Sequence, residues 1–228
     1  MVPTFEARRR TSPTAFASEP LEMDSGFGGL DGEALDLVER RYGDRGLTVS
    51  RERYTSRSQD GDVVCTARDG DDIVGTLSVR FDGKGGLHAD LLFGAELNEW
   101  RAQGVKLCEF GGLAMDKHSR DPRRALAHIF HLGYLHAHRR ARCDRLVIEV
   151  NPRHVGFYRR CLGLVPMTAA RHNPRVNAPA VLMSIDFTDV REQIALWGGL
   201  PDSVAAARSL YPLFWDEATE ATMLARLP

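Results

Sequence analysis

The sequence predicts a mixed α/β fold in which helices flank a central, mostly antiparallel sheet. Two β-branched runs, 63–68 and 73–81, flank the turn Asp69-Gly70-Asp71-Asp72, which is the pattern of a β-hairpin. Amphipathic helical patterns then alternate with short apolar runs of strand length. The order helix, hairpin, strand, helix, strand, helix, strand is typical of a mixed sheet covered by helices.

The first elements along the chain are short. Residues 1–30 are rich in Pro, Ser, Thr, Gly and charge, so we expect a flexible N-terminal lead-in. A short amphipathic helix that ends near Gly43 or Gly46 is predicted by the apolar residues Leu35, Leu37, Val38 and Tyr42. Residues 107–115 predict a strand that Gly111-Gly112 interrupts. A glycine pair inside an apolar strand indicates a bulge or the close approach of a ligand.

The second half of the chain alternates between helix and strand. A strong helix over 123–140 is predicted by a core-facing stripe, namely Leu126, Ile129, Phe130, Gly133 and Ala137. The remaining expected elements are a buried strand at 145–150, a helix at 153–161 and a strand at 180–187. We expect one folded domain over 31–187, with a C-terminal helical extension, 188–228, packed on it. Within that extension, 210–215 is expected to form a helix on the core, with a lid over a bound ligand or a dimer contact as the alternatives.

The charges of the chain are segregated. Its 228 residues carry a net charge of −1, which argues against a dedicated nucleic-acid-binding protein. The stretch from Lys117 to Arg160, however, holds eleven basic and three acidic residues, a net charge of +8. A neutral chain with such a stretch is expected to meet an anionic ligand or partner there.

The spacing of the cysteines and the length of the apolar runs indicate the cellular compartment in which the protein works. The four cysteines fit no zinc spacing and no small disulfide framework, and no run reaches the length of a transmembrane segment. A cytoplasmic protein is therefore expected. No metal site is expected, because no carboxylate or Cys completes a ligand set on the helical face shared by His131 and His138. Partly exposed histidines beside arginines are expected at positions 128, 131, 136 and 138.

The segment from Leu113 to Ala125 predicts an anion site. It places Arg120, Arg123 and Arg124 between the end of a strand and the first turn of a helix. Unpaired backbone N–H groups and the helix dipole at such a position suit a phosphate.

Two motifs together resemble the GNAT acyltransferase superfamily. Arg120, Arg123 and Ala125 match its acyl-donor loop, with Arg123 where a glycine is usual. Asn151 and Tyr158 keep the seven-residue spacing of its later motif. The resemblance implies the GNAT fold and acyl transfer to an amine. Arginine at the glycine position interferes with close contact between the loop backbone and a coenzyme A pyrophosphate, because its Cβ and long side chain occupy the turn.

Further stretches narrow the resemblance. Leu107-Cys-Glu-Phe-Gly-Gly-Leu-Ala-Met-Asp116, Glu149-Val-Asn-Pro-Arg-His-Val, Phe157-Tyr-Arg-Arg and Asn173-Pro-Arg-Val-Asn-Ala-Pro-Ala-Val-Leu182 look like the long-chain N-acyl amino acid synthases of the FeeM type, relatives of the acyl-homoserine lactone synthases. The resemblance covers roughly residues 60–215. It implies acyl transfer from an acyl carrier protein to the α-amine of an amino acid, and an acidic carrier fits the +8 stretch.

The reaction needs a base, an oxyanion donor, an acid and cations. Glu109, on the strand that leads into the bulge, is the predicted base, and Tyr158 is predicted to protonate the leaving thiolate. Backbone N–H groups around Gly111 to Ala114 are expected to hold the oxyanion. Donor contacts are predicted for Gly112, Leu113, Ala114, Arg120, Arg123, Arg124, Ala125 and Asn151. A cation for the acceptor's carboxylate is expected from Arg101, Arg171 or Arg175.

The expected reaction is direct attack on an acyl-phosphopantetheine co-substrate, with no permanently bound cofactor and no acyl-enzyme. The alternatives are an acetyl- or acyl-coenzyme A-dependent GNAT enzyme acting on a small amine, an acyl-homoserine lactone synthase, and a non-catalytic domain that senses acyl thioesters. The expected partners are an acyl carrier protein and an amino acid or small amine, not a nucleic acid. Either a monomer or a homodimer is compatible with the sequence.

Overall fold

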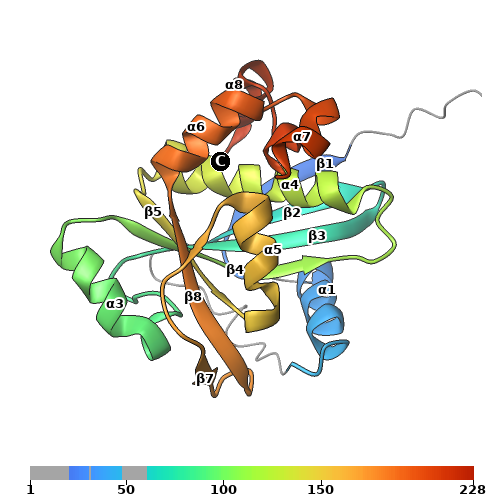
Figure 1. Cartoon of the computed structure of the whole chain (residues 1–228). Helices are drawn as coiled ribbons and strands as arrows, with labels where there is room; N and C mark the ends of the chain where they lie inside the picture. The colour runs from blue at the N-terminus through green and yellow to red at the C-terminus, as the bar shows by residue number, and fades with distance from the viewer. Residues whose placement is uncertain (1–20, 31, 48–60) are drawn as a thin grey trace, which may run out of the picture.

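The computed structural model describes residues 21–30, 32–47 and 61–228 (Figure 1). The strands are β1 (Glu22–Phe27), β2 (Val63–Asp69), β3 (Asp72–Phe81), β4 (Leu107–Met115), β5 (Arg145–Val150), β6 (Val165–Pro166), β7 (Arg171–Asn173) and β8 (Ala178–Asp186). The α-helices are α1 (Gly32–Gly43), α3 (Asp90–Ala102), α4 (Pro122–Tyr134), α5 (Pro152–Leu162), α6 (Phe187–Trp197), α7 (Val204–Ala207) and α8 (Glu217–Arg226). A π-helical segment, Leu135–Arg140, continues α4, and 3-10 turns lie at Pro201–Ser203 and Tyr211–Leu213.

The sheet is mixed and mostly antiparallel, as the sequence predicts. Its strand order is β1-β2-β3-β4-β5-β8-β6, with β7 paired to β8. Among these pairs β4 and β5 run parallel and the others run antiparallel. The parallel ladder extends only from the pair Leu107–Arg145 to the pair Glu109–Val147. Beyond Glu109 the two central strands therefore separate.

The glycine pair of β4 lies at a bulge, which confirms the interpretation of Gly111-Gly112. The register against β3 shifts there, because Gly111 pairs with Ser78 while Ala114 pairs with Thr76. Gly112 has a φ of 57°, which glycine adopts at little cost. The buried Thr76 hydroxyl donates to the Gly112 carbonyl at 2.9 Å, so the bulge is fixed from the neighbouring strand.

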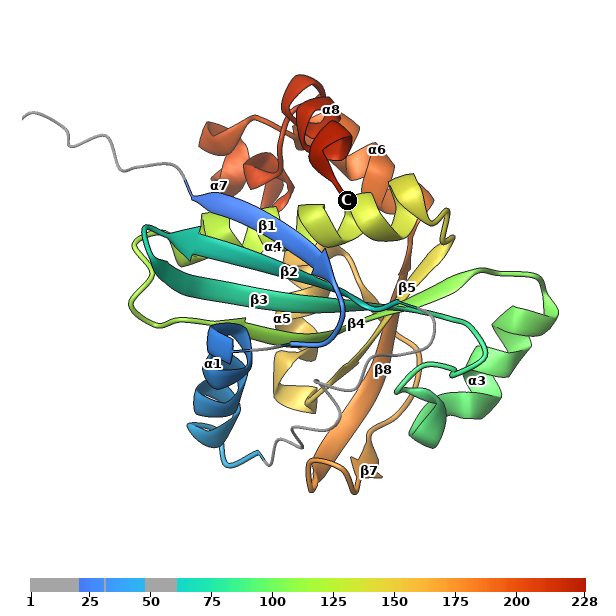
Figure 2. The same cartoon turned by 180° about the vertical axis from the view of Figure 1, so that it is seen from behind.

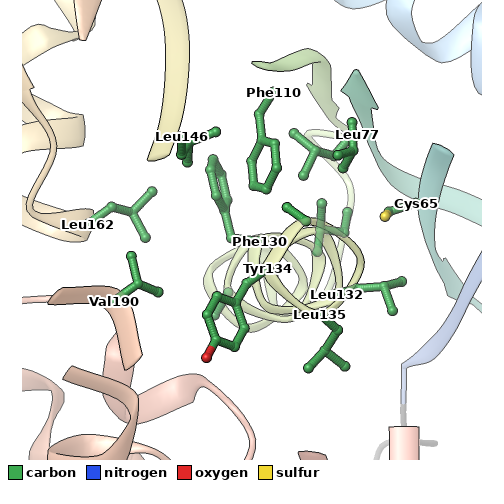
Figure 3. Close-up of a cluster of buried hydrophobic side chains, with 14 of the residues drawn as sticks. Cys65, Leu77, Phe110, Phe130, Leu132, Tyr134, Leu135, Leu146, Leu162 and Val190 are labelled. Atoms are coloured by element: carbon green, nitrogen blue, oxygen red, sulfur yellow. The ribbon is translucent and has the colours of Figure 1, made fainter. Parts of the chain in front are cut away.

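Helices cover both faces of the sheet. Figures 1 and 2 show α4 on one side of β2 and β3, with α1 on the other side, beside β4. Figure 3 shows Leu77, Phe110 and Leu146 pointing from the sheet toward α4. The helix approaches closely because it carries Gly133, where an added Cβ would lie 2.8 Å from Phe110 Cζ.

The expected helix over 123–140 is longer than the α-helix in the structure, which changes to π-helical geometry at Leu135. The expectation of partly exposed histidines is wrong for His131 and His136, which are both buried. The C-terminal extension covers His131, whose ring bonds to Glu220 and to the Trp215 N–H. His136 is covered from the other end of the chain, where its ring lies 2.8 Å from the Ser25 hydroxyl.

Several elements were not predicted. Part of the expected lead-in is structured, because β1 pairs with β2 over its whole length. Its polar sequence, EMDSGF, carries no strand signal, and residues 1–20 lie outside the described part of the chain.

The helix α3 was not predicted either, because it has a weak apolar stripe and a non-helical residue, Phe93, in its interior. The expected helix at 210–215 is a 3-10 turn, although Tyr211, Phe214 and Trp215 do pack on the core.

Candidate active site

A cavity of about 360 Å³ opens where β4 and β5 separate. It is lined by the second half of β4, the end of β5, the first turns of α5, the end of α1 and the β7–β8 turn, all of which can be followed in Figure 1. Its apolar side chains include Leu77, Phe110, Leu126, Phe130, Ile148 and Phe157. Successive residues of a strand point to opposite faces of the sheet, so each separated strand contributes polar groups on one face and apolar groups on the other.

Glu109 lies at the point of separation. Its side chain is 2% exposed and lines the cavity, and its Oε2 accepts a hydrogen bond of 3.1 Å from the Ala89 N–H. Phe110, the next residue, points to the other face and belongs to the α4 core. The predicted base is therefore a buried carboxylate directed into the cavity, beside the strand edge where β5 pairing ends.

Glu149 is a second carboxylate in the cavity, and no role for it was predicted from the sequence. It lies on β5, two residues after the register partner of Glu109, so both carboxylates point to the same face of the sheet. Asn173 Nδ2 donates to Glu149 Oε2 at 3.1 Å, and Arg175 Nη2 lies 3.2 Å from Glu149 Oε1. The period-2 spacing from Val147 to Glu149 was a signal that could have placed Glu149 beside Glu109.

The two residues of the later GNAT-like motif both line the cavity. Asn151 is the N-cap of α5, where its side-chain oxygen accepts from the Arg153 N–H at 3.2 Å. Tyr158 follows on the inner side of the same helix and packs edge-on against Phe130, with ring centroids 6.4 Å apart. Burial raises the pKa of Tyr158 to about 12, so the phenol stays protonated at neutral pH.

The donor-loop residues divide into two groups. Gly112, Leu113 and Ala114 line the cavity, whereas Arg120, Arg123, Arg124 and Ala125 do not. Arg120, in the loop between β4 and α4, forms an ion pair with Asp69 at the end of β2. Ala125 is buried and its N–H bonds to the Asp121 carbonyl within the helix. Arg123 and Arg124 are exposed, and Asp121 caps α4 by accepting from the Arg124 N–H, so this helix start already carries a carboxylate.

Two of the three expected acceptor arginines are outside the cavity, which corrects that expectation. Arg101 bonds to both Asp82 and Asp90 and anchors α3. Arg171 pairs with Glu96 and lies over the Phe93 ring. Each of these cations is satisfied by carboxylates away from the site. Arg175 is next to the cavity through its contact with Glu149 and also donates to the His88 carbonyl.

A family model described as N-acyl amino acid synthase FeeM matches residues 33–186, more than half of the chain. The chain belongs to the FeeM N-acyl amino acid synthase family. The resemblance inferred from the sequence is thereby confirmed. The chain is an N-acyltransferase with a GNAT fold.

Solved structures agree with this assignment. FeeM, an N-acyl amino acid synthase from uncultured soil microbes, is 27% identical, with a TM-score of 0.64 over 76% of this chain and 95% of that chain. Arabidopsis thaliana NAA60 in complex with acetyl-CoA is 11% identical, with a TM-score of 0.51 over 73% of this chain and 99% of that chain, and shows the fold alone. No curated protein sequence matches the chain significantly.

In this FeeM-family chain, α1 contributes a cationic part of the cavity that was not predicted from the sequence. Arg41 and Arg45, at and just beyond the end of α1, line the cavity, as do Arg153 and His154 of α5. Arg41 pairs with Asp44, and its buried Nε has no hydrogen-bond partner among residues 21–30, 32–47 and 61–228. Basic residues in the last turn of a predicted helix were the available signal, but only the fold brings α1 to the cavity.

The thiols do not resemble nucleophiles. Cys108 is fully buried, and burial raises its pKa well above the ordinary value. Cys161 is partly buried and does not line the cavity. Across the described ranges, no group of three or more His, Cys, Asp or Glu side chains is arranged to hold a metal ion. Within the same ranges, no helix has the length and apolar character needed to cross a membrane.

Proposed function

We propose that this enzyme transfers a long-chain acyl group from an acyl carrier protein thioester to the α-amine of an amino acid. The observation that carries the proposal is the cavity between β4 and β5, which joins an apolar region to a pair of carboxylates. An acyl chain requires the apolar region, and an amine that must be deprotonated requires a carboxylate base. The two substrates would meet at Glu109, where the strands separate.

The reaction begins with attack of the amine on the thioester carbonyl carbon. Glu109 accepts the proton that the amine nitrogen loses, directly or through water, as the new C–N bond forms. A backbone N–H of the bulge at Gly111–Ala114 stabilises the tetrahedral oxyanion, and this strand edge has no pairing to β5 beyond Glu109. The C–S bond then breaks, and Tyr158 gives its proton to the departing thiolate. Exchange with solvent returns the proton from Glu109 to Tyr158.

The arginines that line the cavity support the binding of a negatively charged acyl donor. Arg41, Arg45 and Arg153 line the cavity and suit the phosphate of phosphopantetheine or the carboxylate of the acceptor. Arg123 is exposed and does not line the cavity, but it precedes the cavity residue Leu126 by one turn of α4, so the proposal keeps it as a phosphate contact outside the cavity. The net charge of +8 between Lys117 and Arg160 supports docking of an acidic carrier protein.

Direct attack, without an acyl-enzyme, is supported by the thiols. Cys108 is buried with a raised pKa, and Cys161 is away from the cavity. Intact-mass spectrometry of the enzyme with donor alone should therefore show no stoichiometric acyl adduct. Such an adduct on either cysteine would overturn the direct-attack scheme.

The proposal is tested with purified enzyme, a panel of amino acids and matched acyl donors. Each acyl chain is supplied both as acyl carrier protein thioester and as coenzyme A thioester, and products are read by mass spectrometry. We expect N-acyl amino acids, formed more efficiently from the carrier-bound donor. Preferential use of acetyl-coenzyme A on a small amine would replace this proposal by the coenzyme A-dependent alternative. Acyl-donor binding without turnover would favour a sensing domain.

A further inference from the structure

Glu149 is a cavity carboxylate to which the proposed reaction gives no role. Its side chain is 9% exposed, and it faces the cavity on the same side of the sheet as Glu109. The alternating neighbours on β5, Ile148 and Val150, point to the opposite face and belong to the α4 core. The polar face of the cavity thus has one carboxylate from each of the two separated strands.

The Glu149 side chain is held in place by Asn173 and Arg175. Asn173, itself 2% exposed, donates to Glu149 Oε2 through Nδ2, and its Oδ1 accepts from the Arg175 N–H at 2.9 Å. Arg175 Nη2 lies 3.2 and 3.4 Å from the two carboxylate oxygens of Glu149. A carboxylate held by a cation and an amide is expected to keep one orientation.

One peptide group connects this cluster to Glu109. The carbonyl of His88 accepts from Arg175, and the N–H of the same peptide, which belongs to Ala89, donates to Glu109. The spacing of the two carboxylates is therefore set by β4 and β5 on one side and by this peptide on the other. Such a rigid pair is suited to a ligand that bridges both carboxylates.

We propose that Glu149 binds the ammonium group of the acceptor before this group loses one proton to solvent to give the free amine, whose next proton Glu109 accepts during attack, with Asn173 and Arg175 as positioning residues. This inference rests on the proposed acyl transfer to an amine. A charged ammonium gains a charge-assisted hydrogen bond to Glu149, whereas the amide nitrogen of the product is uncharged and loses that attraction. The site would thus favour substrate over product. It would also disfavour acceptors with acidic side chains, because two carboxylates already face them.

The test compares Glu149→Gln with Glu96→Gln, a carboxylate on α3 that Arg171 holds outside the cavity. For Glu149→Gln we expect the acceptor KM to rise about 10-fold to 100-fold, the donor KM to stay within about twofold, and the inhibition constant of the N-acyl product to stay unchanged. For Glu96→Gln we expect none of these to change. An unchanged acceptor KM in Glu149→Gln overturns the inference. A parallel rise in acceptor KM and product inhibition constant also overturns it, because that result indicates a role in shape alone.

A second measurement does not depend on a variant that folds. The acceptor amino acid should raise the Tm of the unaltered enzyme, and its N-acetyl derivative, which lacks the ammonium charge, should not. Equal stabilisation by both compounds would contradict the role of Glu149. Failure of the proposed function is distinguishable, because it means that no N-acyl product forms with any acceptor, whereas this inference fails in an active enzyme.

Discussion

Glu109 and Arg175 are bound to opposite sides of one peptide group, the one that joins His88 to Ala89. The two residues are 66 positions apart in the sequence, Glu109 on β4 and Arg175 in the turn between β7 and β8. Their common contact is the loop before α3, which Arg101 anchors through Asp82 and Asp90. The precision of the site therefore depends on a helix that contributes no side chain to the cavity lining.

Replacement of Glu109 tests the assigned base. Glu109→Gln keeps an oxygen for the Ala89 N–H but cannot accept the amine proton, so kcat is expected to fall about 10²-fold to 10⁴-fold. The Tm should change little, and steady-state kinetics with circular dichroism measure both quantities. The matched control is Glu192→Gln, an exposed carboxylate on α6, for which no loss is expected. Wild-type kcat in Glu109→Gln would exclude Glu109 as the base.

Replacement of Tyr158 tests the assigned acid. Tyr158→Phe is expected to lower kcat by about 10-fold to 100-fold. This loss is at or below the smallest rate effects typical of general acids, because a thiol with a pKa of about 8.5 is already a fair leaving group without protonation. Since burial raises the pKa of Tyr158 to about 12, the acid form persists up to that pH. A pH–rate profile should therefore show no loss of activity assignable to Tyr158 between pH 7 and about 10. The control is Tyr211→Phe, whose ring is buried away from the cavity. A Tyr158→Phe enzyme with full activity contradicts the role.

The exposed arginines at the end of α5 test carrier docking. The double change Arg159→Gln and Arg160→Gln is expected to raise the KM for an acyl carrier protein donor on the order of tenfold at low salt. The effect should vanish near 1 M salt, where the Debye length is about 3 Å. Titration of KM against ionic strength measures this, with Arg191→Gln and Arg226→Gln on the C-terminal helices as the control pair. A salt-independent rise would argue against electrostatic docking.

Gly133 tests the packing of α4 on the sheet. A Cβ at this position would lie 2.8 Å from Phe110 Cζ and 2.9 Å from Leu77 Cδ2, so Gly133→Ala must displace both side chains. We expect a loss of about 1–3 kcal/mol in the free energy of unfolding, measured by denaturant titration. Gly156→Ala on α5 is the matched control, because nothing lies within 4 Å of its added Cβ. There the same change should be neutral or stabilising by up to ~1 kcal/mol. Equal effects at both glycines would refute the close approach.

Glu220 tests the attachment of the C-terminal extension. Burial favours its protonated form, but the hydrogen bond from His131 and the charge of Arg139 outweigh burial and lower the pKa of the Glu220 carboxyl. Because burial also lowers the pKa of His131, Arg139 supplies the cation at neutral pH. Glu220→Gln is expected to cost about 1–3 kcal/mol of unfolding free energy near pH 7.

The sign of the pH dependence follows from the lowered pKa. A carboxyl whose folded pKa is below its unfolded value of 4.5 stabilises the fold above that pH and loses the contribution as the pH falls through the folded pKa. The stability difference between the unaltered enzyme and Glu220→Gln should therefore shrink below about pH 4.5. Denaturation at several pH values measures it, with the exposed Glu217→Gln as the control. A difference that grows in acid would contradict the ion pair.

Much of the fold was predictable from local patterns. The hairpin around Gly70, the strands at 107–115 and 145–150 and the helix that begins at Pro152 all depend on spacing and turn chemistry within a few residues. The family resemblance rests on such local motifs as well, including the seven-residue interval from Asn151 to Tyr158. By contrast, β1 has no signal of its own and is a strand only because β2 offers it a paired edge.

The sequence by itself determined the order of the elements, the mixed sheet and the identity of Glu109, Asn151 and Tyr158 as cavity candidates. The tertiary structure alone decided which charges meet. Arg101 and Arg171 are satisfied by nearby carboxylates outside the cavity, while Arg41 and Glu149 enter it. The physical reason is that a charged side chain pairs with the opposite charge that the fold brings within a few ångströms of it. That distance cannot be read from the separation of the two residues along the chain.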